Sequence, residues 1–127
     1  MALEKQRRMI DLLLEKTKAG KIDWKATIDE KVFQVSFRDN TVQISLLGRD
    51  DDEVDYKITL RNAEGSVAEN FTDIDLWEDQ SHLPEDDRRS YYKIMGDLYE
   101  LARRTALGSE KILNSILEEL GDDKIPF

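Results

Sequence analysis

The chain begins with a stretch in which apolar residues recur at three- and four-residue steps. Charged side chains separate the members of an apolar stripe formed by Leu3, Ile10, Leu13, Leu14 and Thr17. This spacing is typical of an amphipathic helix and predicts one over residues 2–19. Gly20 is suited to cap its C-terminal end. Ile22 and Trp24 are then expected to fold the connection back under the helix.

From Val32 onward the apolar positions alternate with polar ones, which is typical of β-strands. A two-residue turn at Asp39 and Asn40 suits residues that tolerate positive φ. That turn would pair apolar residues with one another: Phe37 with Val42, Val35 with Ile44 and Phe33 with Leu46. The residues between them are polar, so we expect one face of this hairpin in the core and the other in water.

Two further strands are predicted after an acidic loop at residues 48–54. Residues 55–61 alternate, and place Tyr56, Ile58 and Leu60 on the inward side. Residues 66–72 offer Val67 and Phe71 to the core. Glu69 interrupts their alternation, which indicates an edge strand or a bulge.

The last third of the chain has a helical pattern. Pro84 and the three carboxylates that follow it are typical of a helix start. An apolar stripe then runs from residue 91 to residue 120, and Gly108 and Ser109 interrupt it. The pattern fits one long helix equally well as two helices with Ser109 as N-cap.

These patterns together predict a single α+β domain over residues 1–127. Its expected order is an N-terminal helix, a four-stranded antiparallel β-meander, and a C-terminal long helix or helix pair packed on one sheet face.

Composition restricts the chemistry and the location of the protein. The 127 residues include no cysteine, which excludes thiol nucleophiles, disulfides and Cys-ligated metals within this chain. The first ten residues lack the continuous apolar run of a signal peptide, and no segment is apolar enough to span a membrane. We therefore expect a cytoplasmic protein without membrane association.

The net charge of −9 is concentrated in the middle of the chain, where residues 48–87 hold 3 basic and 14 acidic side chains. A field of this sign repels phosphate backbones, so direct binding to nucleic acid is not expected. The predicted strands also direct their aromatic residues inward, which argues against a base-stacking surface. A basic protein partner would be attracted, although acidic loops can also serve solubility alone.

Few residues suggest catalysis or metal binding. His82 is the only histidine, and no nucleophile with an orienting group accompanies it, so we predict no catalytic residue and no enzyme. Carboxylates at residues 50–53 and Asp55 could attract a hard cation. Tyr56, however, stands where a calcium loop requires glycine. We therefore predict neither a metal site nor a cofactor.

The acidic middle of the chain supplies the candidate partner-binding residues. Trp77 lies among carboxylates, which is typical of an interface anchor, but it could equally fix a loop to the core. The candidate set consists of Asp50, Asp51, Asp52, Glu53, Asp75, Trp77, Glu78 and Asp79. Three tyrosines, Tyr91, Tyr92 and Tyr99, suggest a second apolar stripe and hence a homodimer through the C-terminal helical region.

Four segments carry a resemblance that covers most of the chain. They are LLLEKTKAGKIDW from Leu12 to Trp24, FQVSF, YKITLRNAEG and YYKIMGDLYELARRTALG. The chain is similar in these segments to a group of small uncharacterised bacterial proteins. The resemblance implies a bacterial or phage origin, and the group brings no activity, cofactor or site residue with it.

The leading hypothesis is a non-enzymatic protein-interaction module. Its specific form is an acidic inhibitor or immunity-type protein that caps a basic protein partner with residues 49–55 and 73–87. Three alternatives stay open: an acidic dimeric chaperone or adaptor, a nucleic-acid mimic and a metal-dependent enzyme.

Overall fold

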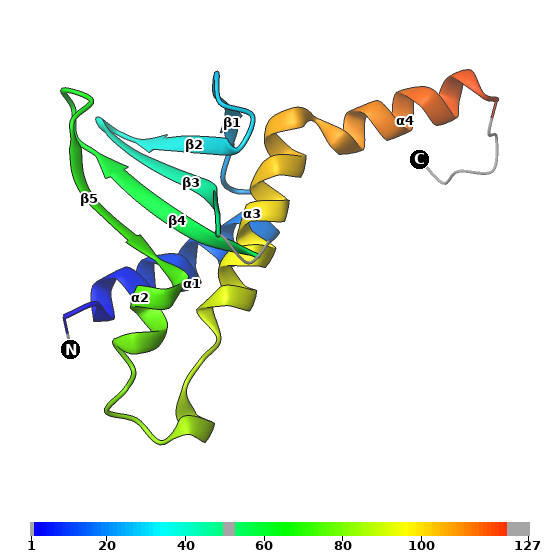
Figure 1. Cartoon of the computed structure of the whole chain (residues 1–127). Coiled ribbons are helices and arrows are strands. Elements are labelled where there is room, and N and C mark those ends of the chain that lie inside the picture. Colours follow the sequence, from blue (N-terminus) through cyan, green and yellow to red (C-terminus); the bar gives the residue numbers. More distant parts are fainter. Residues whose placement is uncertain (1, 50–52, 122–127) are drawn as a thin grey trace.

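The computed structural model describes residues 2–49 and 53–121 (Figure 1). Its elements are α1 (Glu4–Lys18), β1 (Lys25–Ala26), β2 (Val32–Phe37), β3 (Asn40–Gly48), β4 (Val54–Arg61), β5 (Val67–Thr72), α2 (Asp73–Glu78), the 3-10 helix η1 (Glu85–Asp87), α3 (Tyr91–Leu107) and α4 (Ser109–Glu119). The strands form one antiparallel sheet in the order β1-β2-β3-β4-β5. The predicted α+β class, N-terminal helix and antiparallel meander are confirmed. The described sheet has five strands rather than four because Lys25–Ala26 adds a short edge strand.

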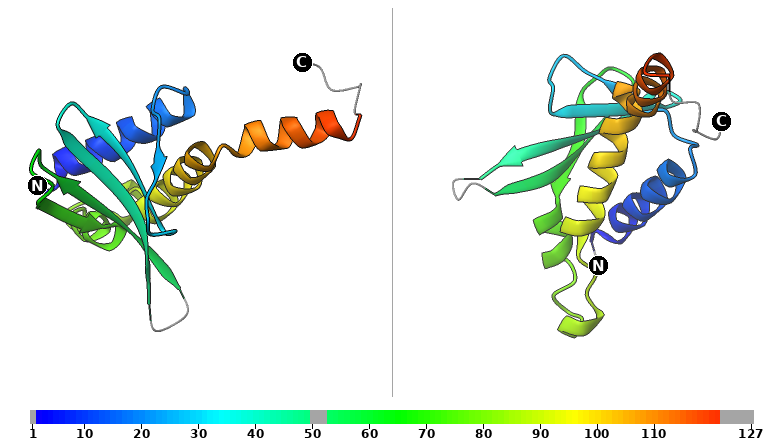
Figure 2. Two further views of the ribbon diagram at one scale, coloured as in Figure 1. Left: turned by 90° about the horizontal axis from the view of Figure 1, so that it is seen from above. Right: turned by 90° about the vertical axis from the view of Figure 1, so that its right-hand side faces the viewer.

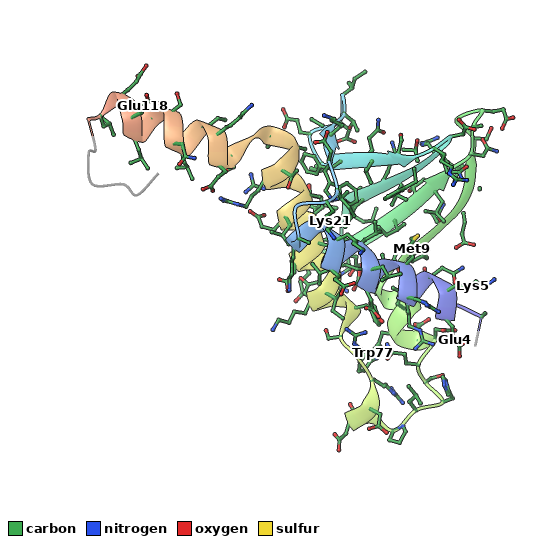
Figure 3. All side chains as sticks on the ribbon, turned by 180° about the vertical axis from the view of Figure 1, so that it is seen from behind. Glu4, Lys5, Met9, Lys21, Trp77 and Glu118 are labelled. Atoms are coloured by element: carbon green, nitrogen blue, oxygen red, sulfur yellow. The ribbon has the colours of Figure 1, made fainter. Side chains whose placement is uncertain are left out.

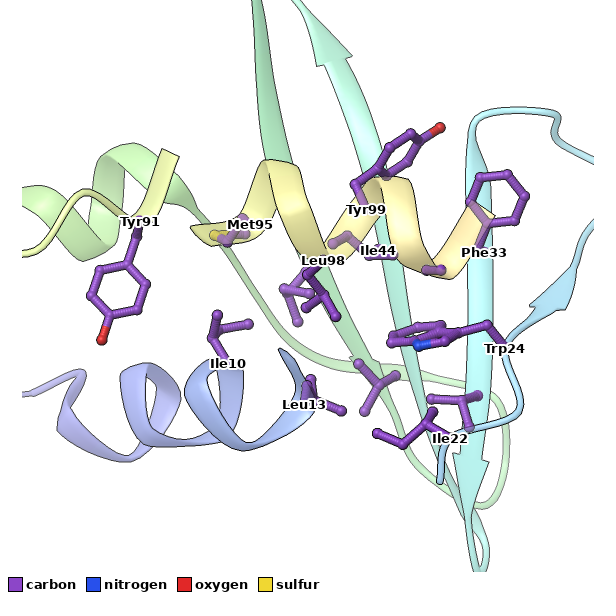
Figure 4. Close-up of a cluster of buried hydrophobic side chains, with 14 of the residues drawn as sticks. Ile10, Leu13, Ile22, Trp24, Phe33, Ile44, Tyr91, Met95, Leu98 and Tyr99 are labelled. Carbon is purple, nitrogen blue, oxygen red and sulfur yellow. The ribbon is translucent and has the colours of Figure 1, made fainter. Parts of the chain in front are cut away.

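The core lies between one face of the sheet and the helices α1 and α3 (Figures 2 and 4). Ile10 of α1 and Leu98 of α3 are fully buried, as are Ile44 and Ile58 of the central strands. The opposite face of the sheet is polar, and Gln43 links its neighbours there by accepting from Arg61 at 3.0 Å and donating to Gln34 at 2.9 Å. The predicted division into a core face and a wet face is therefore confirmed.

The hairpin of β2 and β3 has the predicted faces but a different register. The observed pairs are Phe37 with Asn40, Val35 with Val42 and Phe33 with Ile44. The turn residues are therefore Arg38 and Asp39, and Arg38 adopts a positive φ of 59°. The predicted turn was wrong because a pattern of period two specifies the buried face and cannot distinguish registers that differ by two residues.

The last two strands keep most of the predicted pattern. Ile58 and Phe71 lie in the core as expected, whereas Val67 is half exposed. The register between β4 and β5 shifts next to Leu60, so the predicted irregularity is present and lies at the start of β5, where Val67 is exposed. Glu69 faces α1, where its carboxylate accepts a hydrogen bond of 2.8 Å from the Gln6 side chain.

The connection after α1 folds back under the helix, as the sequence predicts. Gly20 has a φ of +72°, its amide donates to Thr17, and the amide of Lys21 donates to Lys16, which together form a Schellman cap. Trp24 is fully buried, and its indole Nε1 donates a hydrogen bond of 3.0 Å to the Thr17 hydroxyl.

The C-terminal region forms two helices, and only α3 packs on the sheet. Gly108 has a left-handed φ of 66° and ends α3, so the two-helix alternative is the correct one. Gly108 also occupies the N-cap position of α4, which that alternative assigned to Ser109. α4 extends away from the sheet in Figure 1 and contains no buried residue. The prediction that a helix pair packs on the sheet face was therefore wrong for α4. The apolar stripe of α4 stays exposed.

Candidate functional site

The acidic segment after the sheet begins with the short helix α2. Thr72 caps α2 by accepting from the amide of Asp75 at 3.2 Å, and the Asp75 carboxylate accepts in return from the Thr72 amide at 2.9 Å. Leu76 is fully buried and fixes α2 to the core. Gln80 is also buried, and its side chain joins the Leu76 carbonyl to the backbone of Arg89.

This helix forms one wall of a cavity of about 460 Å³, which we call the acidic–aromatic cavity. The other walls come from the end of β3, the start of β4 and the start of α3. The residues that line it are Arg49, Glu53, Asp55, Asp73, Ile74, Trp77, Glu78, Ser90, Tyr91 and Tyr92. The lining therefore contains four carboxylates, one guanidinium and three aromatic rings. A cavity of this composition favours a cationic group with apolar surface.

The deepest carboxylates of the cavity are held by the protein itself. Asp55 is buried, and its carboxylate lies 3.4 Å from a guanidinium nitrogen of Arg49, which also pairs with Glu53. Asp73 is buried and accepts a hydrogen bond of 2.8 Å from the amide of Tyr56. Burial raises the pKa of the Asp73 carboxyl, and the negative charge of Asp55 raises this pKa further. Asp55 and Asp73 are thus held in place by contacts within the chain.

The aromatic side chains differ in how far they are available to a partner. Trp77 is 37% exposed, and the guanidinium of Arg88 lies 5.4 Å from its ring centre. Tyr92 is also exposed and contacts Tyr56 with ring centres 5.5 Å apart. Tyr91 is buried, with its hydroxyl 3.2 Å from the Asp11 carboxylate of α1. Trp77 and Tyr92 are therefore the rings that a bound group can contact.

The structure places the candidate partner-binding residues in different environments. Glu53, Trp77 and Glu78 line the acidic–aromatic cavity together, although residues 53 and 77 are far apart in the sequence. Asp50, Asp51 and Asp52 lie outside the described residues. Ile74 and Trp77 are exposed while Leu76 is buried, so Leu76 is the residue that fixes this segment to the core.

The other two candidates serve the fold. The Asp75 carboxylate belongs to the capping box of α2. Asp79 is largely buried, lies 3.5 Å from the guanidinium of Arg7, and accepts from the amide of Leu3 at 3.3 Å. Both carboxylates are consequently engaged with the chain itself, and both lie outside the cavity.

The sequence hypothesis included Arg49, Asp55 and Asp73 only as members of the segments 49–55 and 73–87, and did not place them in the candidate set. A count of charges along the chain does not show which of them become buried. The tyrosines were expected on a dimer surface, yet Tyr91 and Tyr99 are both buried within the domain. The Tyr99 hydroxyl donates to the Lys31 carbonyl at 3.1 Å.

Other candidate chemistry is sparse. His82 lies exposed in the loop after α2. Within residues 2–49 and 53–121, no group of three or more His, Asp or Glu side chains is arranged to hold a metal ion. In the same part of the chain, no helix is both long enough and apolar enough to cross a membrane.

Comparison with protein-family models, with curated proteins and with solved structures finds no match for this chain.

Proposed function

We propose that this protein is a non-enzymatic protein-interaction module that binds a basic protein partner at the acidic–aromatic cavity. The observation that carries the proposal is the composition of this cavity, which combines four carboxylates and the exposed ring of Trp77 with a single arginine. An arginine or lysine side chain of a partner would enter with its charge beside the carboxylates and its stem against the aromatic rings.

The protein's own contacts illustrate the type of recognition that we propose. Arg88 places its guanidinium over the Trp77 ring, and Arg49 lies between Glu53 and Asp55. A guanidinium is thus accommodated both on the aromatic and on the acidic side of the cavity. The excess of carboxylates over cations leaves room for a further positive charge.

The specific form of the proposal is an inhibitor or immunity-type protein that caps a functional surface of its partner. A long-range negative field accelerates the encounter with a basic partner, and the aromatic anchor slows dissociation. Both properties suit a protein that must outcompete the normal ligand of its target.

A matched pair of variants tests the proposal by affinity capture from an extract of the native host at low and high salt. Glu53→Gln with Glu78→Gln removes two carboxylates from the cavity. Glu85→Gln with Asp86→Asn removes two exposed carboxylates from η1, outside the cavity, and gives the same net charge. We expect one stoichiometric basic protein that binds the control variant as it binds the wild type and binds the cavity variant about tenfold more weakly at low salt.

Equal capture by both variants, or capture that does not respond to salt, would contradict the proposal. For the inhibitor form, the captured protein must also lose its own activity when titrated with one equivalent of this chain.

A second candidate function, an acidic dimeric chaperone or adaptor, is favoured by the exposed apolar residues of α4. A chaperone would retain many unfolded clients, whereas an interaction module with one partner would retain a single folded protein. The composition of the captured material therefore separates the two functions.

A further inference from the structure

α4 carries an apolar stripe that the domain leaves uncovered. Ile112, Leu113, Ile116 and Leu120 are each about half exposed or more, with Ile116 at 51% and Leu120 at 75%. Their spacing places them on one face of the helix over about 12 Å of its length. Such a face on a helix that projects from a domain is typical of a segment that packs against another molecule.

A separate apolar groove lies between α1 and the β2–β3 hairpin and has a volume of about 410 Å³. Met9, Leu12 and Phe37 contribute to its apolar floor, and Leu12 and Phe37 are nearly half exposed. Its cations, Lys5, Arg8 and Lys16, follow α1 over about 16 Å, which is enough for the stripe of α4. The described lining of the groove includes no acidic side chain. We call this surface the basic groove.

The helix and the groove are complementary in charge as well as in polarity. By helical position, Glu110 and Glu119 flank the two sides of the apolar stripe of α4, and both are exposed. Glu110 has only a distant ion pair with Arg104, at 3.8 Å. An acidic border on the helix thus matches the basic border of the groove. We propose that α4 of one copy of this chain occupies the basic groove of a second copy.

The position of the two surfaces favours a second copy over an intramolecular contact. Figure 3 places Glu118 of α4 and Lys5 and Met9 of α1 at opposite ends of the molecule. Pairing of α4 with another α4 is less favourable than binding in the groove. Each α4 carries Glu110, Glu118 and Glu119 against one lysine, so two such helices repel each other.

The simplest closed assembly is a dimer in which each copy inserts α4 into the groove of the other. This assembly covers the exposed stripe and the groove at the same time, and neither surface shares a lining residue with the acidic–aromatic cavity. The inference is therefore independent of the proposed function.

Sedimentation of the full chain tests the inference, with one variant for each surface. Ile116→Glu interrupts the stripe, and Asn114→Glu is its control because, by helical position, it adds the same charge on the face of α4 away from the stripe. Lys5→Glu with Lys16→Glu reverses the border of the groove, and Lys18→Glu with Lys93→Glu is the control with the same change of net charge. All of the substituted side chains except Ile116 are polar and exposed, and Ile116 is half exposed. We therefore expect every variant to fold, and circular dichroism verifies this.

We expect the wild type to dimerise with an affinity that falls as salt rises. Each surface variant should weaken self-association by about tenfold or more, and the controls should not. A mixture of the two surface variants should recover a one-to-one complex, because one intact α4 and one intact groove are present in the mixture.

Three results would overturn the inference. The first is a wild type that stays monomeric at the highest accessible concentration. The second is a groove variant that dimerises like the wild type, which would indicate α4–α4 pairing. The third is a mixture that shows no association beyond that of its components.

Discussion

Leu98 and Leu113 allow one substitution to be compared on two consecutive helices. Leu98 of α3 is fully buried, whereas Leu113 of α4 is 48% exposed. Leu→Ala in a core removes apolar contacts and leaves a cavity, which costs about 3 kcal/mol of unfolding free energy. The same change at an exposed position alters the unfolding free energy by no more than about 0.5 kcal/mol.

Urea unfolding followed by far-ultraviolet circular dichroism measures this difference at low micromolar protein. We expect Leu98→Ala to lower the midpoint by about 1–2 M and Leu113→Ala by less than about 0.3 M, with unchanged slopes. An equal loss in the two variants would show that α4 packs on the domain, and would refute the account of α4 as a projecting helix. At high protein concentration, Leu113→Ala should become measurably destabilising, because self-association then contributes to stability.

Substitutions at three further positions test the contacts of α2 and its neighbours. Because burial raises the pKa of Asp73, its contribution to stability is largest at acidic pH and is lost as the pH rises through that raised pKa. Asp73→Asn should therefore gain stability over the wild type at neutral pH, a gain that shrinks on acidification; a pH-independent difference in urea midpoint would contradict this. Asp79→Ala leaves the largely buried Arg7 without its partner and should lower the unfolding free energy by about 3 kcal/mol. A thermal melt close to that of the wild type would count against a structural role of this ion pair. Thr72→Ala removes the N-cap of α2 and should cost about 1 kcal/mol, while Thr72→Ser should retain most of the stability in the same melt.

The periodic part of the fold could be predicted from the sequence because burial follows local spacing. The stripe of α1 and the alternation of β4 specify which side chains face the core, and the structure agrees at Ile10, Leu13 and Ile58. The turn of the first hairpin could not be predicted in this way. Registers two residues apart bury the same face, and the choice of Arg38 for positive φ contradicts local preference.

The candidate site could be predicted only in part, because it depends on contacts between distant segments. Trp77 and Glu78 stood out as an aromatic residue beside a carboxylate, and both line the cavity. Asp75 and Asp79 also have acidic neighbours in the sequence. The Asp75 carboxylate nevertheless belongs to the capping box of α2, and the Asp79 carboxylate pairs with Arg7. Local charge density does not distinguish a carboxylate that serves the fold from one that is available to a partner.

The exposed stripe of α4 illustrates the same limit for periodicity. Its spacing is that of a core-facing helix, and we expected it to cover the sheet. Gly108 redirects the chain, so the stripe extends away from the domain instead. An amphipathic pattern therefore predicts that a helix will bury one face, but not which molecule will cover it.

The central claim is that a basic protein binds at the acidic–aromatic cavity, and NMR tests it most directly. The N–H spectrum of isotope-labelled protein contains one indole signal for each of the two tryptophans, and an unlabelled partner adds no signal of its own. On titration with the captured partner, we predict that the indole signal of Trp77 and the amides of residues 73–78 shift. The signal of the buried Trp24 should stay in place. Saturated binding that leaves the Trp77 indole and these amides unshifted would contradict the account.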